Sequence, residues 1–233
     1  MTEFRPGRFE ILPTVIKNLV IINTLVFIAQ VTFGSKLPLD NLFALHTWQS
    51  DLFKPWQFVT YLFMHGGVTH LFFNMFAIWM FGSTLENLWG PKRFITFYIA
   101  CGLGAALCHM IVIYFQNQEL IQTFRSWPAQ QQEFYQDNFY RALNVPTVGA
   151  SGSVYGCLAA FGYLFPNSYL YIFPLPFPIK VKWAVIGYIG LEVYSSIQNN
   201  PGDSIAHIAH LGGALVGFLL VYFWNRTNRR RFY

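Results

Sequence analysis

A serine and a histidine stand in apolar parts of this chain, where a polar side chain requires a chemical reason. Ser151 lies in Gly149-Ala150-Ser151-Gly152 at the start of one apolar segment, and His210 lies near the start of a later one. Hydroxyl and imidazole groups are unfavourable in hydrocarbon unless they are partnered or wetted. An imidazole within hydrogen-bond reach takes the proton of a serine hydroxyl and later delivers it to a leaving amine. The pair predicts nucleophilic catalysis inside a membrane, with Ser151 as nucleophile and His210 as general base.

Further polar residues are suited to the oxyanion that forms when a serine attacks a peptide carbonyl. Such an oxyanion needs preorganised hydrogen-bond donors. His70 and Asn74 supply an imidazole and an amide, and their i, i+4 spacing places them on one face of a helix. The N–H of Ser151 is a third donor, because the first residues of a helix leave their N–H groups unpaired. We expect His70, Asn74, Ser151 and His210 at similar depths, since each stands early in its apolar segment.

The chain as a whole is too apolar for a soluble domain. Of its 233 residues, 54% are hydrophobic and only 11% are charged, and the mean hydropathy is +0.36. A membrane-spanning helix needs about 17 to 25 mostly apolar residues. By that rule the sequence predicts an all-α integral membrane protein whose six transmembrane helices lie at 14–33, 67–89, 94–115, 151–166, 180–197 and 205–224.

The basic residues predict how this bundle is oriented. Cytoplasmic loops hold an excess of Lys and Arg. Of the fifteen basic residues, eleven would lie on one face and four on the other, the four being Lys36, Lys54, Arg125 and Arg141. Both termini are therefore expected in the cytoplasm, with a short arm at 1–12, the bundle at 13–225 and a basic tail at 226–233. We expect the tail to contact anionic membrane lipids, and we expect no nucleic-acid partner.

The fourth span is too short to cross a membrane unaided. From Ser151 to Pro166 there are about fifteen residues, roughly 22 Å of helix, against about 30 Å of hydrocarbon. If the cytoplasmic end lies near Pro166, Ser151 is submerged, and 144–149 must enter the membrane as irregular backbone. Such backbone is tolerated only where it is buried in protein or lines a water-filled cavity. We therefore expect an aqueous cavity at Ser151, which hydrolysis also requires.

Small residues predict that the fourth and sixth spans pack closely. Gly152 and Gly156 lie four residues apart on one span, and Gly213 and Gly217 lie four apart on the other. Pairs of this kind let membrane helices approach each other closely.

The surroundings of His210 include an aromatic residue but no obvious acid. Tyr155, one turn below Ser151, is placed to pack on the His210 ring and hold its orientation. Neither Glu86 nor Glu192 is expected beside the histidine, because both are placed near the cytoplasmic end or the middle of the membrane, and Asp203 belongs to a loop. The sequence therefore predicts a Ser–His dyad without a third member.

A long segment at 116–148 should hold structure of its own, because it exceeds the usual length of a connection. Tyr135, Phe139 and Leu143 recur at i, i+4 and i+8 within it. That spacing predicts an amphipathic helix.

Taken together and in order, these motifs resemble those of the rhomboid intramembrane proteases, over nearly the whole chain. The matching residues are Gly149-Ala150-Ser151-Gly152 with Tyr155, His70 and Asn74 with the preceding His65, Ala209-His210-Leu211-Gly212-Gly213, and the GxxxExxxG pattern Gly82, Glu86 and Gly90. Gln57 departs from the family, some members of which have Trp-Arg where this chain has Trp56-Gln57. The departure puts the hydrogen bonding of the first outer loop in doubt, and leaves the chemistry unaffected.

The resemblance implies a six-helix rhomboid core that uses a Ser–His dyad without metal or cofactor. It implies cleavage of single-span membrane proteins near the outer ends of their helices. By matching positions, Ser151 is the nucleophile and His210 the base, while His70, Asn74 and the Ser151 amide bind the oxyanion. Tyr155 and the glycines Gly149, Gly152 and Gly213 support the site. The minimal six-span core favours a multi-pass protein of a bacterial inner membrane, of undetermined oligomeric state.

The chain lacks the motifs of other intramembrane proteases and the repeats typical of transporters. A zinc-dependent intramembrane protease needs HExxH, which the chain lacks, and an aspartyl one needs a GxGD signature that Pro201-Gly202-Asp203 does not match. A transporter usually shows inverted repeats, and none is found. A proteolytically inactive rhomboid-like protein that binds membrane clients stays open as the alternative, although such relatives lack the serine or the histidine and this chain has both.

The remaining polar residues of the spans have ordinary structural interpretations. His207 is expected to pack, because it is not followed by glycines at the spacing seen after His210. His46 and His109 are expected to be structural or interfacial. Glu192 is expected to be paired within the bundle, and Glu86 to be structural near the cytoplasmic end of the second span.

Overall fold

The computed structural model of the protein describes residues 9–171, 176–197 and 203–227. The expected arm at 1–12 and tail at 226–233, with five of their arginines, therefore lie largely outside the described residues. The described chain is helical apart from β1 (Tyr169–Leu170) and β2 (Ile179–Lys180), which pair antiparallel with Tyr169 opposite Lys180. This confirms the all-α class.

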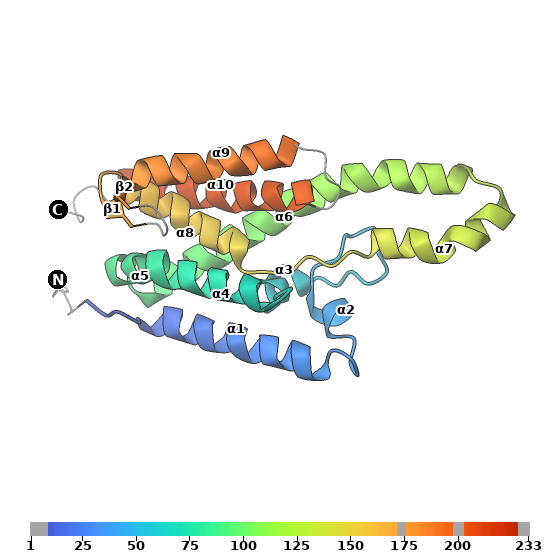
Figure 1. Ribbon diagram of the computed structural model, residues 1–233, viewed down its shortest axis with the longest axis horizontal. Helices are drawn as coiled ribbons and strands as arrows, with labels where there is room; N and C mark the ends of the chain where they lie inside the picture. The colour runs from blue at the N-terminus through green and yellow to red at the C-terminus, as the bar shows by residue number, and fades with distance from the viewer. Residues whose placement is uncertain (1–8, 172–175, 198–202, 228–233) are drawn as a thin grey trace.

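Six segments of the structure run side by side along its long axis (Figure 1). They are α1 (Thr14–Phe33), the continuous run of α4 (Val68–Ala77), η2 (Ile78–Gly82) and α5 (Ser83–Trp89), α6 (Pro91–Ser126), α8 (Ser151–Leu164), α9 (Val181–Ile197) and α10 (Asp203–Thr227). Three short elements and one longer one complete the described chain: α2 (Leu39–Phe43), α3 (Gln57–Thr60), η1 (Tyr61–Phe63) and α7 (Ala129–Leu143). Helix α10 packs against α8, α6 and α9.

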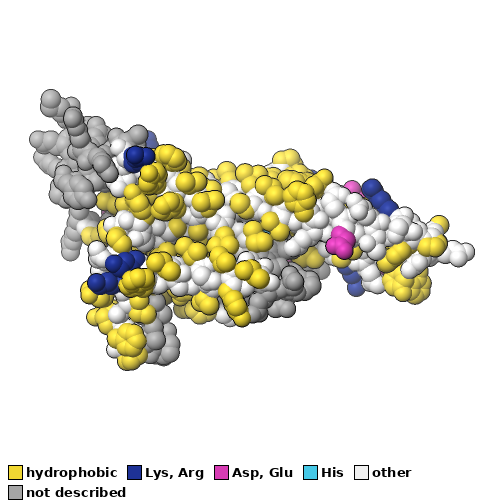
Figure 2. Space-filling view, turned by 90° about the horizontal axis from the view of Figure 1, so that it is seen from above, with side chains coloured by type: hydrophobic (Ala, Val, Ile, Leu, Met, Phe, Trp, Pro, Cys, Tyr) yellow, Lys and Arg dark blue, Asp and Glu magenta, His cyan; other side chains and the backbone are white. Residues whose placement is uncertain are grey.

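Four of these segments are long and apolar enough to cross a membrane: Thr14–Phe33, Val68–Trp89, Pro91–Ser126 and His207–Arg226. Hydrophobic side chains cover the middle of the face shown in Figure 2, and basic side chains lie toward its two ends. Helix α8, with 14 residues, is as short as the sequence predicts and begins at Ser151, while α9 has 17 residues. The protein is thus a helical membrane protein, and six crossings remain a prediction.

The two ends of the described chain lie at the same end of the bundle. Figure 1 shows the start of α1, the end of α10, the turn between α5 and α6, and the β1–β2 pair together at one end. The long connections that contain α2, α3 and α7 lie at the other end. This arrangement agrees with both termini lying on one side of a membrane, and their placement in the cytoplasm remains a prediction.

Helices α8 and α10 cross with their backbones in contact, which confirms the prediction from the glycine pairs. A Cβ on Gly213 would lie 2.1 Å from the carbonyl oxygen of Gly152, and one on Gly217 would lie 2.6 Å from that of Gly156. Because both obstacles are backbone atoms, the helices could not relieve the clash by a side-chain rotation. Glycine at these positions lets α8 and α10 approach closely, so that Ser151 on one helix can face His210 on the other.

Glu86 fixes the start of α1, which confirms its structural role. Its Oε1 accepts the N–H of Val15 and its Oε2 accepts the N–H of Ile16, each at 2.9 Å. The first N–H groups of a helix have no partner within it, and a carboxylate there also interacts favourably with the helix dipole. Gly90, with φ of +80°, ends α5 directly before α6 begins.

Helix α6 contains the span expected at 94–115 and extends beyond it at both ends. It begins at Pro91 and continues to Ser126. The polar run after Phe115 ended the apolar pattern without ending the helix, because Gln and Glu are good helix formers in water. The amphipathic helix expected within 116–148 is α7, which packs back on α6 with the rings of Phe124 and Phe139 stacked 4.0 Å apart.

Gln57 completes the hydrogen bonding of the first outer loop. Its Oε1 accepts the N–H groups of His46 and Lys54, and its Nε2 donates to the carbonyls of Asn41 and Leu52. A side-chain amide has two donor hydrogens and one oxygen with two lone pairs, so every site is used. The departure at Gln57 therefore leaves this amide fully hydrogen-bonded within the loop.

The irregular backbone before α8 is hydrogen-bonded to this loop. Leu45 and Thr147 exchange two backbone hydrogen bonds of 2.9 Å, and the N–H of Gly149 donates to the carbonyl of Tyr61 at 2.9 Å. His109 Nε2 and the Thr147 hydroxyl are 2.6 Å apart, so His109 has a structural role as expected. The outer loop thereby fixes the point at which α8 starts.

Candidate active site

Ser151 is the first residue of α8. Gly149, two residues before it, permits the backbone conformation that places it there. Gly149 has φ of +126°, a conformation that side chains disfavour, and a Cβ on it would lie 2.8 Å from Cε1 of His70. The N–H of Val154 bonds to the carbonyl of Ala150, which starts the helical pattern. The N–H of Ser151 therefore has no partner within the helix and is available to a ligand.

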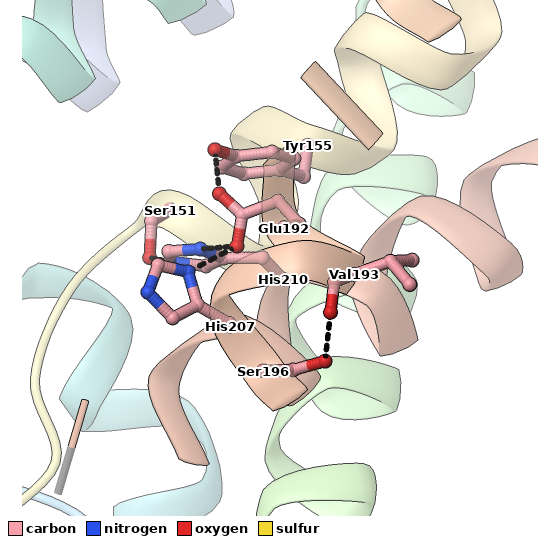
Figure 3. A network of polar contacts seen from close by, with 7 residues as sticks. All are labelled: Ser151, Tyr155, Glu192, Val193, Ser196, His207 and His210. Carbon is pink, nitrogen blue, oxygen red and sulfur yellow. Dashed lines mark hydrogen bonds and ion pairs between the residues drawn. The ribbon is translucent and has the colours of Figure 1, made fainter. Parts of the chain in front are cut away.

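Ser151 and His210 face each other from α8 and α10. The hydroxyl oxygen of Ser151 lies 2.8 Å from Nε2 of His210, and both residues are partly exposed (Figure 3). That distance is normal for a hydrogen bond in which a hydroxyl donates to an imidazole nitrogen. The structure therefore brings together the two residues that the sequence singled out.

His70 and Asn74 lie on α4, and the structure places His70 beside Gly149, two residues before Ser151 in the chain. Asn74 is 5% exposed, and its Nδ2 has no hydrogen-bond partner among the described residues. The N–H of Gly66 approaches Nδ1 of His70 at 3.4 Å, and the buried ring of His65 packs edge-on against that of His70 at 5.2 Å. A buried amide without a partner needs an explanation, and a ligand is one.

Tyr155 packs on His210, as the sequence predicts. The two rings are nearly parallel, at 8°, with centroids 4.4 Å apart. Tyr155 also donates its hydroxyl hydrogen to Oε1 of Glu192. The tyrosine therefore contacts both the histidine and an acid on the neighbouring helix.

The expectation that no acid lies beside His210 was wrong. Oε2 of Glu192, on α9, lies 3.1 Å from Nδ1 of His210, on the opposite side of the imidazole from Ser151 (Figure 3). Glu192 lies closer to the outer end of the fifth span than to its cytoplasmic start. Counted back from Ile197, where α9 ends, Glu192 lies five residues deep, and His210 lies at a comparable depth in α10.

The expectation that His207 only packs was also wrong. Its Nδ1 lies 2.6 Å from the same oxygen of Glu192. His207 and Glu192 therefore form a hydrogen-bonded pair, and Glu192 is paired within the bundle as expected. Only the spatial approach of α9 to α10 reveals these contacts, because no local sequence spacing relates Glu192 to His207.

Among the described residues, Glu192, His207 and His210 form a cluster that could hold a metal ion. One ligand atom from each lies within 4.8 Å of the others. In a tetrahedral zinc site, bonds of about 2.0 to 2.2 Å keep ligand atoms roughly 3.3 Å apart. The separation of 2.6 Å between His207 and Glu192 is shorter and is that of a hydrogen bond. The cluster as it stands is a hydrogen-bonded network.

A groove of about 400 Å³ opens between α8, α9 and α10. Its mostly apolar lining includes Gly162, Val185 and Leu215, and it is separate from the pair of Ser151 and His210. The aqueous cavity expected at Ser151 remains a prediction.

Comparison with known proteins gives the family. A model of the rhomboid domain matches residues 52–227. Rhomboid protease AarA of Providencia stuartii is 28% identical over 214 residues, which cover 87% of this chain and 69% of AarA. Rhomboid protein 1, mitochondrial, of Saccharomyces cerevisiae is 28% identical over 162 residues, covering 70% of this chain and 39% of that protein. Rhomboid protease GluP of Bacillus subtilis is 26% identical over 189 residues, covering 81% and 28%.

Two of these relatives carry protease names, and the chain spans between about a quarter and two thirds of the length of the three. The matched region includes Ser151, His210, His70 and Asn74, together with the whole of α4 to α10. Because the family model matches well over half of the residues, this chain belongs to the rhomboid family.

Proposed function

We propose that the protein is an intramembrane serine endopeptidase that hydrolyses peptide bonds in or near the transmembrane helices of other membrane proteins. The observation that carries the proposal is the 2.8 Å contact between the hydroxyl of Ser151 and Nε2 of His210. The protein also belongs to the rhomboid family and has relatives named as rhomboid proteases, which supports the same activity.

The reaction begins when the Ser151 oxygen attacks the carbonyl carbon of the scissile bond. His210 takes the hydroxyl proton on Nε2 as the new C–O bond forms. It then delivers that proton to the leaving nitrogen as the C–N bond breaks, which leaves an acyl-enzyme on Ser151. Water attacks the ester with His210 again as base, and the second product leaves as a carboxylic acid. No metal or cofactor takes part in these steps.

Three donors are proposed to bind the oxyanion in both tetrahedral intermediates: the N–H of Ser151, Nδ2 of Asn74 and Nε2 of His70. The first has no partner within α8, and the second has none among the described residues. In a neutral imidazole one nitrogen donates and the other accepts. Since Nδ1 of His70 accepts the Gly66 N–H, its Nε2 carries the proton. A donor set of this kind typically contributes about 3 to 4 kcal/mol per donor to the rate.

The proposed substrates are single-span membrane proteins, reached through the lipid. A peptide bond within a helix is hydrogen-bonded and shielded, so the substrate must unwind locally before Ser151 can attack it. Water must reach Ser151 as well, and its partial exposure is consistent with access from the outer end of the bundle. We place the protein in a bacterial inner membrane with both termini in the cytoplasm and with anionic lipids around its basic ends.

The direct test is cleavage of labelled single-span substrates by the purified full chain in detergent. We expect Ser151→Ala and His210→Ala each to reduce the rate by at least about 10³-fold, and a chelator to leave it unchanged. Ser126→Ala removes an exposed hydroxyl at the end of α6 and is the matched control, with full activity expected. Full activity in Ser151→Ala would overturn the proposal. A wild type that binds but cleaves none of a substrate panel would favour the client-binding alternative.

A further inference from the structure

We infer that Glu192 is the third member of the site and positions His210 for catalysis, so that the protein works with a Ser–His–Glu arrangement. This inference rests on the proposed function, because it assigns Glu192 a role in the same reaction. It departs from the dyad that the family resemblance implies. Figure 3 shows the carboxylate on the far side of the His210 ring from Ser151.

The contact with Glu192 determines which nitrogen of His210 carries the proton. An ionised carboxylate only accepts hydrogen bonds, so the contact of 3.1 Å with Glu192 places a hydrogen on Nδ1 of His210. The unprotonated nitrogen of the neutral ring is then Nε2, which faces the Ser151 hydroxyl at 2.8 Å. This is the tautomer that a general base needs. Glu192 therefore selects the productive form of the histidine.

Glu192 also stabilises the positive charge that develops on His210. When His210 takes the serine proton it becomes a cation. An acid in contact with its other nitrogen stabilises that cation throughout the step. The side chain of Glu192 is only 8% exposed, against 20% for that of His210, so the interaction is little weakened by solvent.

The carboxylate of Glu192 is itself held in place. Tyr155 donates its hydroxyl hydrogen to Oε1, and His207 Nδ1 lies 2.6 Å from Oε2. A buried carboxylate requires such partners to stay ionised. Because the Tyr155 ring also stacks on His210, the acid and the base are fixed relative to each other from two directions.

A purely structural role, in which Glu192 only ties α9 to α10, makes different predictions for two substitutions. Glu192→Gln keeps the length and volume of the side chain but removes the charge. Its amide can also donate to Nδ1 of His210 and so favour the wrong tautomer. Glu192→Asp keeps the charge but is one methylene shorter. A tether would tolerate Gln better than Asp, whereas a positioning carboxylate would tolerate Asp better than Gln.

The experiment measures kcat and KM for both variants in detergent, together with the rate at which a fluorophosphonate labels Ser151. We expect Glu192→Gln to lower kcat about 100-fold with KM changed less than about threefold, and to slow labelling in proportion. The known loss for the carboxylate of a Ser–His–Asp site is about 10⁴-fold. We expect the kcat of Glu192→Asp to be at least about tenfold higher than that of Glu192→Gln. Glu119→Gln, an exposed substitution on α6, is the matched control and should behave as wild type.

The outcomes separate this inference from the proposed function. Cleavage that is lost in Ser151→Ala but full in Glu192→Gln overturns the positioning role and leaves the serine protease intact. Cleavage that persists in Ser151→Ala overturns both. Higher activity in Glu192→Gln than in Glu192→Asp, or a change in KM alone, identifies a tether. A melting temperature close to that of wild type in each variant separates loss of chemistry from loss of fold.

Discussion

The ring of Tyr155 lies flat against the imidazole of His210, with centroids 4.4 Å apart and planes 8° apart, while its hydroxyl hydrogen bonds to Glu192. One side chain on α8 thus contacts a base on α10 and an acid on α9. The stacking limits rotation of the imidazole, and the hydroxyl limits rotation of the carboxylate. The two contacts are separable by substitution.

Replacing Tyr155 by Phe keeps the stacking and removes only the hydroxyl. We expect kcat to fall about three- to tenfold, because Glu192 retains its contact with His207. Tyr155→Leu removes both contacts and should lower kcat at least about tenfold further. Steady-state cleavage assays measure both, with the exposed Tyr194→Phe on α9 as control. Equal rates for Tyr155→Phe and Tyr155→Leu would show that the stacking contributes nothing.

Substitution of Gly149 by Ala should damage the site more than the fold. The new Cβ would meet the His70 imidazole at 2.8 Å, and a side chain at φ of +126° is itself unfavourable by about 1 to 2 kcal/mol. We expect kcat to fall more than about tenfold as His70 moves. Gly187→Ala on α9, where a Cβ meets nothing within 4 Å, is the control and should retain activity. Unchanged cleavage by Gly149→Ala would show that His70 has no fixed role.

Substitution of Gly213 by Ala should force α8 and α10 apart. The Cβ would lie 2.1 Å from the Gly152 carbonyl oxygen. A backbone oxygen cannot avoid this clash by a side-chain rotation. We expect destabilisation of about 3 kcal/mol or more and a melting temperature lower by about 6 to 12 °C. Thermal unfolding in detergent measures it, and Gly190→Ala, with open space at its Cβ, should change little. A normal melting temperature would contradict the close crossing.

Glu86→Gln should loosen the start of α1 without touching the site. The amide retains a single acceptor oxygen for the N–H groups of Val15 and Ile16, and it loses the favourable interaction of a charge with the helix dipole. We expect the free energy of unfolding to fall by about 1.5 to 3 kcal/mol. Chemical unfolding measures the change, and Glu119→Gln should stay within about 0.5 kcal/mol of wild type. An equally small effect in Glu86→Gln would show that α1 is held by packing alone.

The folded protein should become less stable in mild acid because of His46 in the first outer loop. Burial lowers the pKa of His46 below its ordinary value of 6.5, despite the nearby carbonyl and charge of Asp40. The unfolded chain therefore binds a proton at a pH at which the folded chain does not, and stability is lost as the pH falls below about 6.5. Melting temperatures from pH 7.5 downwards measure the decline. His46→Gln should decline less steeply, and parallel curves for the two proteins would contradict this origin.

Local patterns in the sequence are sufficient for much of this architecture. Apolar length predicts the helices α1, α4 to α5, α8 and α10, because a helix in lipid must bury its own backbone bonds over a definite length. The break at Pro166 predicts the short α8, and the spacing of Gly152, Gly156, Gly213 and Gly217 predicts its contact with α10. Ser151 and His210 stood out because polar groups in apolar segments are expensive.

The extent of α6 and the neighbours of His210 required the tertiary structure. Hydropathy marks where lipid ends, whereas a helix continues into water as long as its residues favour one, so α6 runs on to Ser126. Glu192 and His207 belong to different helices, and their contact depends on how α9 is rotated and translated against α10. That placement is set by packing of whole surfaces, which no local spacing encodes. The sequence by itself determined which groups could do the chemistry, and the packing of α9 decided that an acid lies beside the base.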